Sequence, residues 1–210
     1  CLPDGDVAPG GVGQILFNAG IVHRVGPRRL NVKLARRLAA RGIASLRFDL
    51  SGLGDSGRAP GADGFDVQAP RDLRAAMDAL AGETGLARFS LFGFCSGGRH
   101  AYATAPLDAR VAGLILYDTF AFPTWRSRLN RYGVRIRHDG LAGAVLGRLR
   151  RLAGAGAAVA ETSGDGSFVA APTHEAFAER VRALLARGTK VGVIHSGEGA
   201  NYNYEGQFRD

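Results

Sequence analysis

The sequence predicts an α/β fold, in which a mostly parallel sheet carries helices on both faces. Short apolar runs alternate along the chain with longer segments whose apolar residues recur every three or four positions. The short runs are typical of buried strands and the longer segments of amphipathic helices, so their alternation favours a parallel sheet. The 210 residues suffice for one such domain with a sizeable core.

Residues 1–13 hold four Gly and two Pro and are predicted to be a loop or the remnant of a hairpin. Five short apolar runs after this segment are predicted as strands. They are Gln14–Asn18, Ile43–Leu50, Arg88–Phe94, Val111–Tyr117 and Lys190–Ser196.

The segments between the strands carry helical periodicity. Leu30, Leu34 and Leu38 share one face of a helix that Gly42 ends. The predicted helices are Arg28–Arg41, Pro70–Ala81, the segment that follows Phe94 through about Ala105, and His174–Arg187.

Residues 119–172 break the alternation of strands and helices. An Arg-rich, helix-compatible stretch, Trp125–Leu152, precedes a segment of small residues, 153–166. Such an insertion is typical of a helical cap or lid over a sheet, and a poorly ordered loop is the alternative. The domain is therefore predicted to span 14–210, with 119–172 as its cap insertion.

The net charge of +8 does not predict a nucleic-acid partner. Of the 27 basic residues only Lys33 and Lys190 are lysines, and the arginines are dispersed without an aromatic surface beside them.

No apolar stretch is long enough to cross a membrane. The chain starts at Cys1 rather than Met and shows no secretory signal, so we expect it to be cut at both ends. Two cysteines make no disulfide framework and fit a cytoplasmic location.

The most informative motif is a glycine-rich turn after the third predicted strand, GFCSGG at 93–98. It has the pattern of a nucleophile elbow, a strained strand-to-helix turn that exposes one side chain. The residues two before and two after the nucleophile crowd each other and must be small. Gly93 and Gly97 meet this condition for Cys95, whereas Phe94 is too large for Ser96 to be the nucleophile. An ordinary Gly-rich turn is the alternative.

Three segments together resemble the α/β-hydrolase superfamily, from about Gln14 to Ser196. Residues 18–26 (NAGIVHRVG) are similar to the family's oxyanion loop, 48–56 (FDLSGLGDS) resemble its D-x-x-G-x-G-x-S turn, and 93–97 are the elbow. More narrowly, Arg24-Val25-Gly26, the GLGDS turn and Cys95 resemble bacterial hydrolases associated with exosortase systems. A cysteine elbow also occurs in dienelactone hydrolases.

The resemblance implies attack by Cys95 on an ester or thioester of a small molecule, through an acyl-enzyme intermediate. The backbone N–H of Ser96 would be one oxyanion donor, and Gly20 or Ile21 would supply the second. The side chain of Ser96 either adds a hydrogen bond or fills the turn. His23 lies in the oxyanion loop, where it could line the pocket.

The resemblance also implies an acid and a histidine after the nucleophile. Glu198 is the closest match for the acid, and Asp118 is the second candidate. The family's histidine would follow Asp210, so either the chain is a fragment or the protein has lost catalysis. His195, at the end of the last predicted strand, is a stand-in base or has a structural role.

Other patterns predict no cofactor and no metal. The glycines of the two turns lack the dinucleotide-binding spacing, and no Cys/His cluster has zinc spacing. Asp49 and Asp55 are interpreted as turn-forming carboxylates that cap local N–H groups. A non-catalytic, hydrolase-like accessory or binding protein of a polysaccharide or secretion pathway is the alternative function. The sequence predicts no oligomeric state.

Overall fold

The computed structural model describes residues 1–5, 7, 10–61, 63–122, 124–126, 129 and 171–197. The chain divides into two compact units, one made of 1–120 and 167–194 and the other of 121–166 and 195–210. The first unit holds the sheet and its helices. Most of the predicted cap, 119–172, lies outside the described residues, so the cap stays a prediction.

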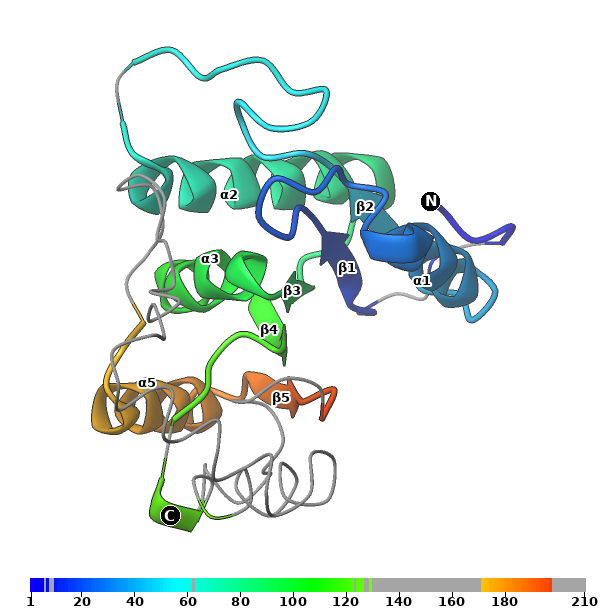
Figure 1. Ribbon diagram of the computed structural model, residues 1–210. Coiled ribbons are helices and arrows are strands. Elements are labelled where there is room, and N and C mark those ends of the chain that lie inside the picture. The colour runs from blue at the N-terminus through cyan, green and yellow to red at the C-terminus, as the bar shows by residue number, and fades with distance from the viewer. Residues whose placement is uncertain are drawn as a thin grey trace, which may run out of the picture. The chain divides into compact units, whose positions relative to one another are not determined.

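The first unit is built on a five-stranded sheet in which all neighbouring strands are parallel (Figure 1). The strands are β1 (Gly13–Leu16), β2 (Ser45–Arg47), β3 (Phe89–Phe94), β4 (Val111–Tyr117) and β5 (Lys190–Ile194). Their order is β2-β1-β3-β4-β5. This is one of the common orders of doubly wound sheets, and it reverses direction between β1 and β3.

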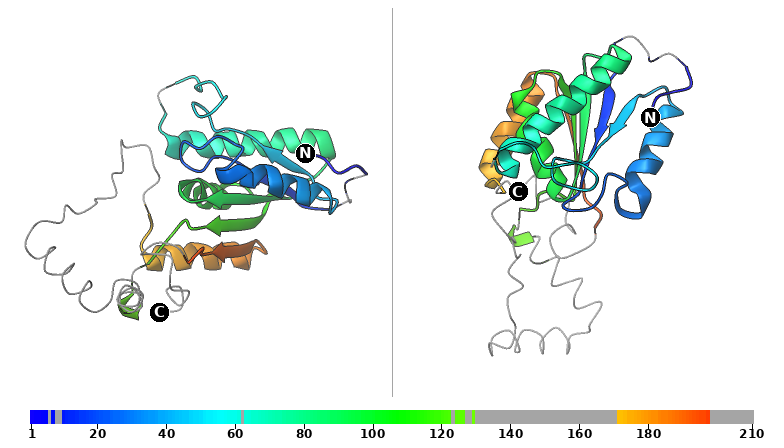
Figure 2. Two further views of the ribbon diagram at one scale, coloured as in Figure 1. Left: turned by 45° about the vertical axis from the view of Figure 1, so that its right-hand side comes forward. Right: turned by 90° about the horizontal axis from the view of Figure 1, so that it is seen from above.

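Helices connect the strands. They are α1 (Leu30–Ala39), α2 (Phe65–Thr84), α3 (Ser96–Thr104) and α5 (His174–Ala186), with short 3₁₀ turns η1 (Pro27–Arg29) and η2 (Ala105–Leu107). Helix α1 covers one face of the sheet, and α2, α3 and α5 cover the other (Figure 2). Right-handed crossovers require this division, because the chain runs one way from β1 to β2 and the opposite way from β2 to β5.

The core lies on both faces of the central strands. On the α1 side Leu16 and Phe92 pack with Ala35. Their sequence neighbours Ile15 and Leu91 are also fully buried, because successive side chains of a strand point to opposite faces. Strands buried on both faces explain the continuous apolar runs of the sequence. The arrangement fits the α/β-hydrolase-like fold that the sequence predicts.

The element boundaries differ from the sequence prediction mainly in α2. The helix begins at Phe65 rather than Pro70 and ends at Thr84, where Gly85 adopts φ 69 and donates to the carbonyl of Ala81. Pro70 therefore lies inside the helix. A proline has no N–H to donate and is expected at the first turn, which is why the sequence pattern placed the start too late. The strands β1, β2 and β5 are also shorter than predicted.

Candidate active site

The candidate site lies where the order of the strands reverses. The loops that follow β1 and β3 leave the sheet side by side at the carboxyl edge, because the two strands are parallel neighbours. Crevices at such switch points are where doubly wound sheets bind ligands. The segment 17–26 follows β1 and Cys95 follows β3, so the topology brings two of the three predicted segments together.

Cys95 joins β3 to α3 in an unusual backbone conformation. Its φ of 54° and ψ of −125° lie in a region that a residue with a side chain rarely adopts. Its N–H donates to the carbonyl of Tyr117 at 2.8 Å, which ties the turn to β4. The side chain is exposed and makes no disulfide. The turn thus holds a free thiol outward, at the N-cap of a helix.

Glycines around Cys95 allow this turn to pack tightly. A Cβ on Gly93 would overlap the α-carbon of Gly98, and a Cβ on Gly97 would overlap the backbone carbonyl oxygen of Asn18. The sequence pattern predicts that residue 93 crowds residue 97. The closest neighbour of Gly93 is instead Gly98, while the carbonyl carbon of Gly97 would lie 3.0 Å from such a Cβ. Both predicted positions do require glycine.

Three backbone amides, one next to Cys95 and two in the loop after β1, have no acceptor among the described residues. Within the described residues the N–H groups of Gly20, Ile21 and Ser96 make no hydrogen bond. Ser96 is the first residue of α3, where an amide has no partner inside the helix. A Cβ on Gly20 would lie 3.4 Å from Oγ of Ser96, so the tip of the 17–26 loop lies beside the start of α3. Ile21 is 84% exposed.

Of the three residues predicted as acid or base, the structure describes Asp118 and His195. Asp118 follows β4 with φ 46°, and its N–H donates to the carbonyl of Ile194 at 2.9 Å. It therefore lies at the carboxyl edge, on the strand next to β3. Glu198 is outside the described residues. His195 belongs to the second compact unit, whereas Cys95 belongs to the first. The roles of these three residues stay predictions.

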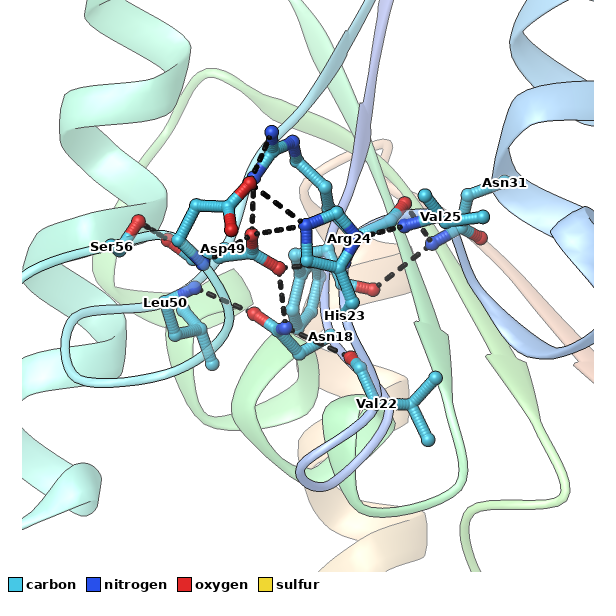
Figure 3. Close-up of polar contacts among 11 residues, drawn as sticks. Asn18, Val22, His23, Arg24, Val25, Asn31, Asp49, Leu50 and Ser56 are labelled. Atoms are coloured by element: carbon cyan, nitrogen blue, oxygen red, sulfur yellow. Dashed lines mark hydrogen bonds and ion pairs between the residues drawn. The ribbon is translucent and has the colours of Figure 1, made fainter.

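A buried carboxylate, Asp49, accepts hydrogen bonds from two segments, the loop after β1 and the turn after β2 (Figure 3). Its Oδ1 accepts from Nδ2 of Asn18 at 2.7 Å and from the N–H of Arg24 at 2.6 Å. Its Oδ2 accepts from Nη1 of Arg24 at 2.5 Å and from the N–H of Asp55 at 3.2 Å. The bond from Asp55 confirms Asp49 as a turn-forming carboxylate. The carboxylate of Asp55 instead pairs with His23 and Arg24.

His23 faces this network. Its Nδ1 accepts the N–H of Val25 at 3.3 Å, so its proton is assigned to Nε2, which lies 3.1 Å from Oδ2 of Asp55 and 3.3 Å from Oδ2 of Asp49. The side chain of His23 is 37% exposed. Its contacts account for its place in the loop, and its proposed role in lining a substrate pocket stays a prediction.

The charges of the network favour ionised carboxylates. Burial acts to raise the pKa of Asp49, but the backbone amides of Asp55 and Arg24, together with the guanidinium of Arg24, outweigh burial and lower it. Hydrogen bonds from His23 and Arg24 lower the pKa of Asp55. Donor atoms of His23, Asp49 and Asp55 lie within 4.8 Å of one another, a spacing that could hold a metal ion. Because Arg24 already pairs with both carboxylates, the geometry fits an ion-pair network better than a cation site.

A cavity of about 350 Å³ lies between the turn after β2 and the start of α2. Its lining includes Leu53, Arg58, Phe65 and Gln68. Cys95 is not among the lining residues. The cavity opens on the carboxyl side of β2, at the same edge of the sheet as the candidate site.

No protein-family model matches the chain, and no curated protein matches it. Among solved structures it is similar to DcsB in complex with its substrate analogue, at 20% identity over 68% of this chain and 48% of that chain, with a TM-score of 0.48. A thermophilic esterase from Thermogutta terrifontis with malate bound is 29% identical over 62% of this chain and 46% of its own, with a TM-score of 0.41.

A third similar structure is the α/β hydrolase GrgF from Penicillium sp. sh18, at 21% identity over 90% of this chain and 61% of that chain, with a TM-score of 0.45. The chain spans about half the length of the first two proteins and less than two thirds of the third. At TM-scores below 0.5 these likenesses carry no inference about what this chain binds or catalyses.

Asn18 and Arg24 were not predicted individually as parts of the site. Both are polar residues that follow β1, and Asp49 follows β2, the parallel neighbour of β1. Polar residues in the loops after two adjacent parallel strands were the available signal, because such loops meet at one edge of the sheet. In the part of the chain that the structure describes, no helix has the length and hydropathy needed to cross a membrane.

Proposed function

We propose that this chain is the catalytic part of a hydrolase that cleaves an ester or thioester of a small molecule, with Cys95 as its nucleophile. The observation that carries the proposal is the exposed Cys95 thiol on a backbone with φ 54°, followed by the amide of Ser96, which has no acceptor among the described residues. A strained turn that exposes a nucleophile beside a free N–H is the arrangement that acyl transfer uses.

In the proposed reaction the sulfur of Cys95 attacks the acyl carbonyl carbon. The negative charge that develops on the carbonyl oxygen is stabilised by the amide of Ser96 and by an amide of Gly20 or Ile21. The tetrahedral intermediate then expels the alcohol or thiol, which takes up a proton. Water attacks the resulting thioester, releases the acid and returns a proton to the thiol, so that the enzyme is regenerated.

A histidine is proposed to move these protons, because a thiol at its ordinary pKa is mostly protonated at neutral pH. Asp118 or Glu198 would orient this histidine. Asp118 is supported by its place directly after β4, because Cys95 directly follows β3, the paired neighbour of β4. For His195, which follows β5, a role as stand-in base and a structural role both stay open. The segment 119–172 is proposed as the cap that shapes the substrate pocket.

The narrower assignment is to a bacterial, exosortase-associated hydrolase of the cytoplasm, proposed from the Arg24-Val25-Gly26 segment, the turn 52–56 and Cys95. Arg24 pairs with Asp49 and Asp55, so the arginine and the acidic residue of these two segments act in one network. This pairing links the two segments physically, and the association with exosortases rests on the sequence resemblance alone.

Labelling with an activated ester tests the proposed function. The full chain is treated with a small p-nitrophenyl ester or an activated thioester, and the acylated residue is located by peptide mass spectrometry. Cys95 is expected to carry the acyl group. The label is expected to disappear in Cys95→Ala and to persist in Ser96→Ala, which keeps the amide of residue 96. No acylation of the folded chain would favour the accessory or binding protein.

A further inference from the structure

Gly20 and Ile21 form the tip of a tight turn whose two ends are joined by two hydrogen bonds. The N–H of Val22 donates to the carbonyl of Ala19 at 3.0 Å, and Nδ2 of Asn18 donates to the carbonyl of Val22 at 2.9 Å. Gly20 has φ 58°, a conformation that suits glycine at this place in a turn. The direction of the two unbonded tip amides therefore depends on what holds the ends of this turn.

One buried carboxylate holds both ends. Asp49 is 3% exposed and comes from the turn after β2, outside the loop itself. Its Oδ1 accepts from Asn18, which begins the loop, and from the N–H of Arg24, which ends it. The guanidinium of Arg24 donates a further, charge-assisted hydrogen bond to Oδ2 (Figure 3). A single anionic group thus clamps the two arms of the turn that carries Gly20 and Ile21.

The clamp needs a charged acceptor with two oxygens. In the described residues the carboxylate of Asp49 accepts four hydrogen bonds and donates none. An asparagine would place an NH₂ group where one carboxylate oxygen now accepts, so donor would face donor at Arg24 or at the amide of Asp55. A Cβ on Gly54 would overlap the carboxylate, so the surrounding turn leaves no space for a shifted side chain.

We propose that Asp49 is a positioning residue for acyl transfer, which holds residues 18–24 so that the tip amides of Gly20 and Ile21 face the acyl oxygen of a substrate on Cys95. The inference rests on the proposed function and names a residue through which the proposed oxyanion site is built. Asp49 acts through the loop and touches no substrate. A misplacement of such donors by about 1 Å lowers a rate by up to about 100-fold.

Two reactions of the Cys95 thiol distinguish a loss of correctly placed oxyanion donors from a general loss of structure in a variant. Every variant carries Cys1→Ser, so that Cys95 is the only thiol of the chain. Acylation by an activated ester passes through an oxyanion, whereas alkylation by iodoacetamide forms none. The ratio of the two rate constants at Cys95 therefore reports the oxyanion donors and cancels changes in exposure of the thiol.

Asp49→Asn is compared with Asp72→Asn, a matched control. Asp72 also braces the turn after β2, since it accepts the N–H and the hydroxyl of Ser51 at 2.7 and 2.8 Å, but among the described residues it makes no bond to the 18–24 loop. We expect the acylation-to-alkylation ratio to fall about tenfold or more in Asp49→Asn and to stay within about twofold in Asp72→Asn. Amide exchange at Val22 is expected to become faster only in Asp49→Asn.

An unchanged ratio in folded Asp49→Asn overturns the proposal, as does an equal fall in both variants. If Asp49→Asn does not fold, Arg24→Gln carries the test, because it removes one charged donor and keeps the carboxylate. Its ratio is expected to fall about threefold, and an unchanged ratio overturns the proposal. If the unsubstituted protein shows the same ratio folded and unfolded in urea, the proposed function itself is wrong, and the role of Asp49 is refuted with it.

Discussion

The backbone carbonyl of Asn18 packs against the α-carbon of Gly97 so closely that a Cβ at residue 97 would overlap its oxygen. Asn18 follows β1 and Gly97 lies in the first turn of α3, so this contact fixes the loop after β1 against the helix that starts behind Cys95. The side chain of Asn18 also bonds Asp49 and Leu50, which extends the contact to the turn after β2.

Gly97→Ala is expected to destabilise the protein by about 1–3 kcal/mol, because the added methyl group meets backbone that cannot move alone. Gly82→Ala is the control. Gly82 lies in α2 with open space around it, so alanine there is expected to raise the free energy of unfolding by about 0.5–1 kcal/mol. Urea unfolding measures both. A Gly97→Ala variant as stable as the original protein would show that the contact is not tight.

Asn18→Asp is expected to destabilise the fold most at neutral pH. Asn18 is 1% exposed, and its Nδ2 lies 2.7 Å from Oδ1 of Asp49, so an aspartate would bring two carboxylates together. The loss is expected to be about 2–4 kcal/mol at pH 7 and smaller at pH 4, where the pair can share a proton.

Asn18→Ala provides the control for that variant. It removes the same hydrogen bonds without adding a charge, so its loss of unfolding free energy, measured against the original protein at each pH, is expected to be similar at pH 7 and pH 4. Denaturant titrations at both pH values make the comparison. If the two variants show the same pH dependence, then residue 18 does not face the ionised carboxylate of Asp49.

The unfolding free energy is expected to depend on pH through His100. This histidine is 4% exposed, packs against Phe65, and its Nδ1 has no hydrogen-bond partner within the described residues. Burial and then the nearby charge of Arg99 lower its pKa from 6.5 to about 4, with Asp66 acting in the opposite direction. The unfolded chain therefore binds more protons between these values, and stability rises with pH across this window.

Full stabilisation from the neutral ring of His100 is present above pH 6.5 and is lost as the pH falls towards about 4. The loss is expected to be up to about 3 kcal/mol. His100→Gln, which cannot titrate, is expected to remove this part of the slope. Unfolding titrations between pH 4 and pH 7 provide the measurement. Parallel curves for the two proteins would rule out His100 as the group responsible.

The sheet and the turn at Cys95 could be predicted because their signals are local. Most strands lie in short apolar runs, and the glycines at 93 and 97 lie within two positions of Cys95. The start of α2 could not be placed, because the contacts of its first turns are with other segments: Phe65 is half-buried against His100, and Ala69 is buried. A proline at the sixth helical position masked this extension.

The clamp at Asp49 could not be predicted for a different reason. Asn18 and Asp49 are 31 positions apart, and their contact exists only because β1 and β2 are parallel neighbours. The sequence identified Asp49 and Asp55 as turn-forming residues from their local pattern. The strand order decides which of the two carboxylates is buried. It also brings Arg24 back to pair with both of them, which no spacing within one segment could indicate.

The central claim is that the fold presents amide donors to an acyl group on Cys95. It is tested most directly by the ratio of acylation to alkylation at Cys95, measured in the Cys1→Ser protein both folded and unfolded in urea. The account predicts a ratio at least about tenfold higher in the folded protein, since one well-placed oxyanion donor contributes about 100- to 1,000-fold to a rate. An equal or lower ratio in the folded protein would contradict the account.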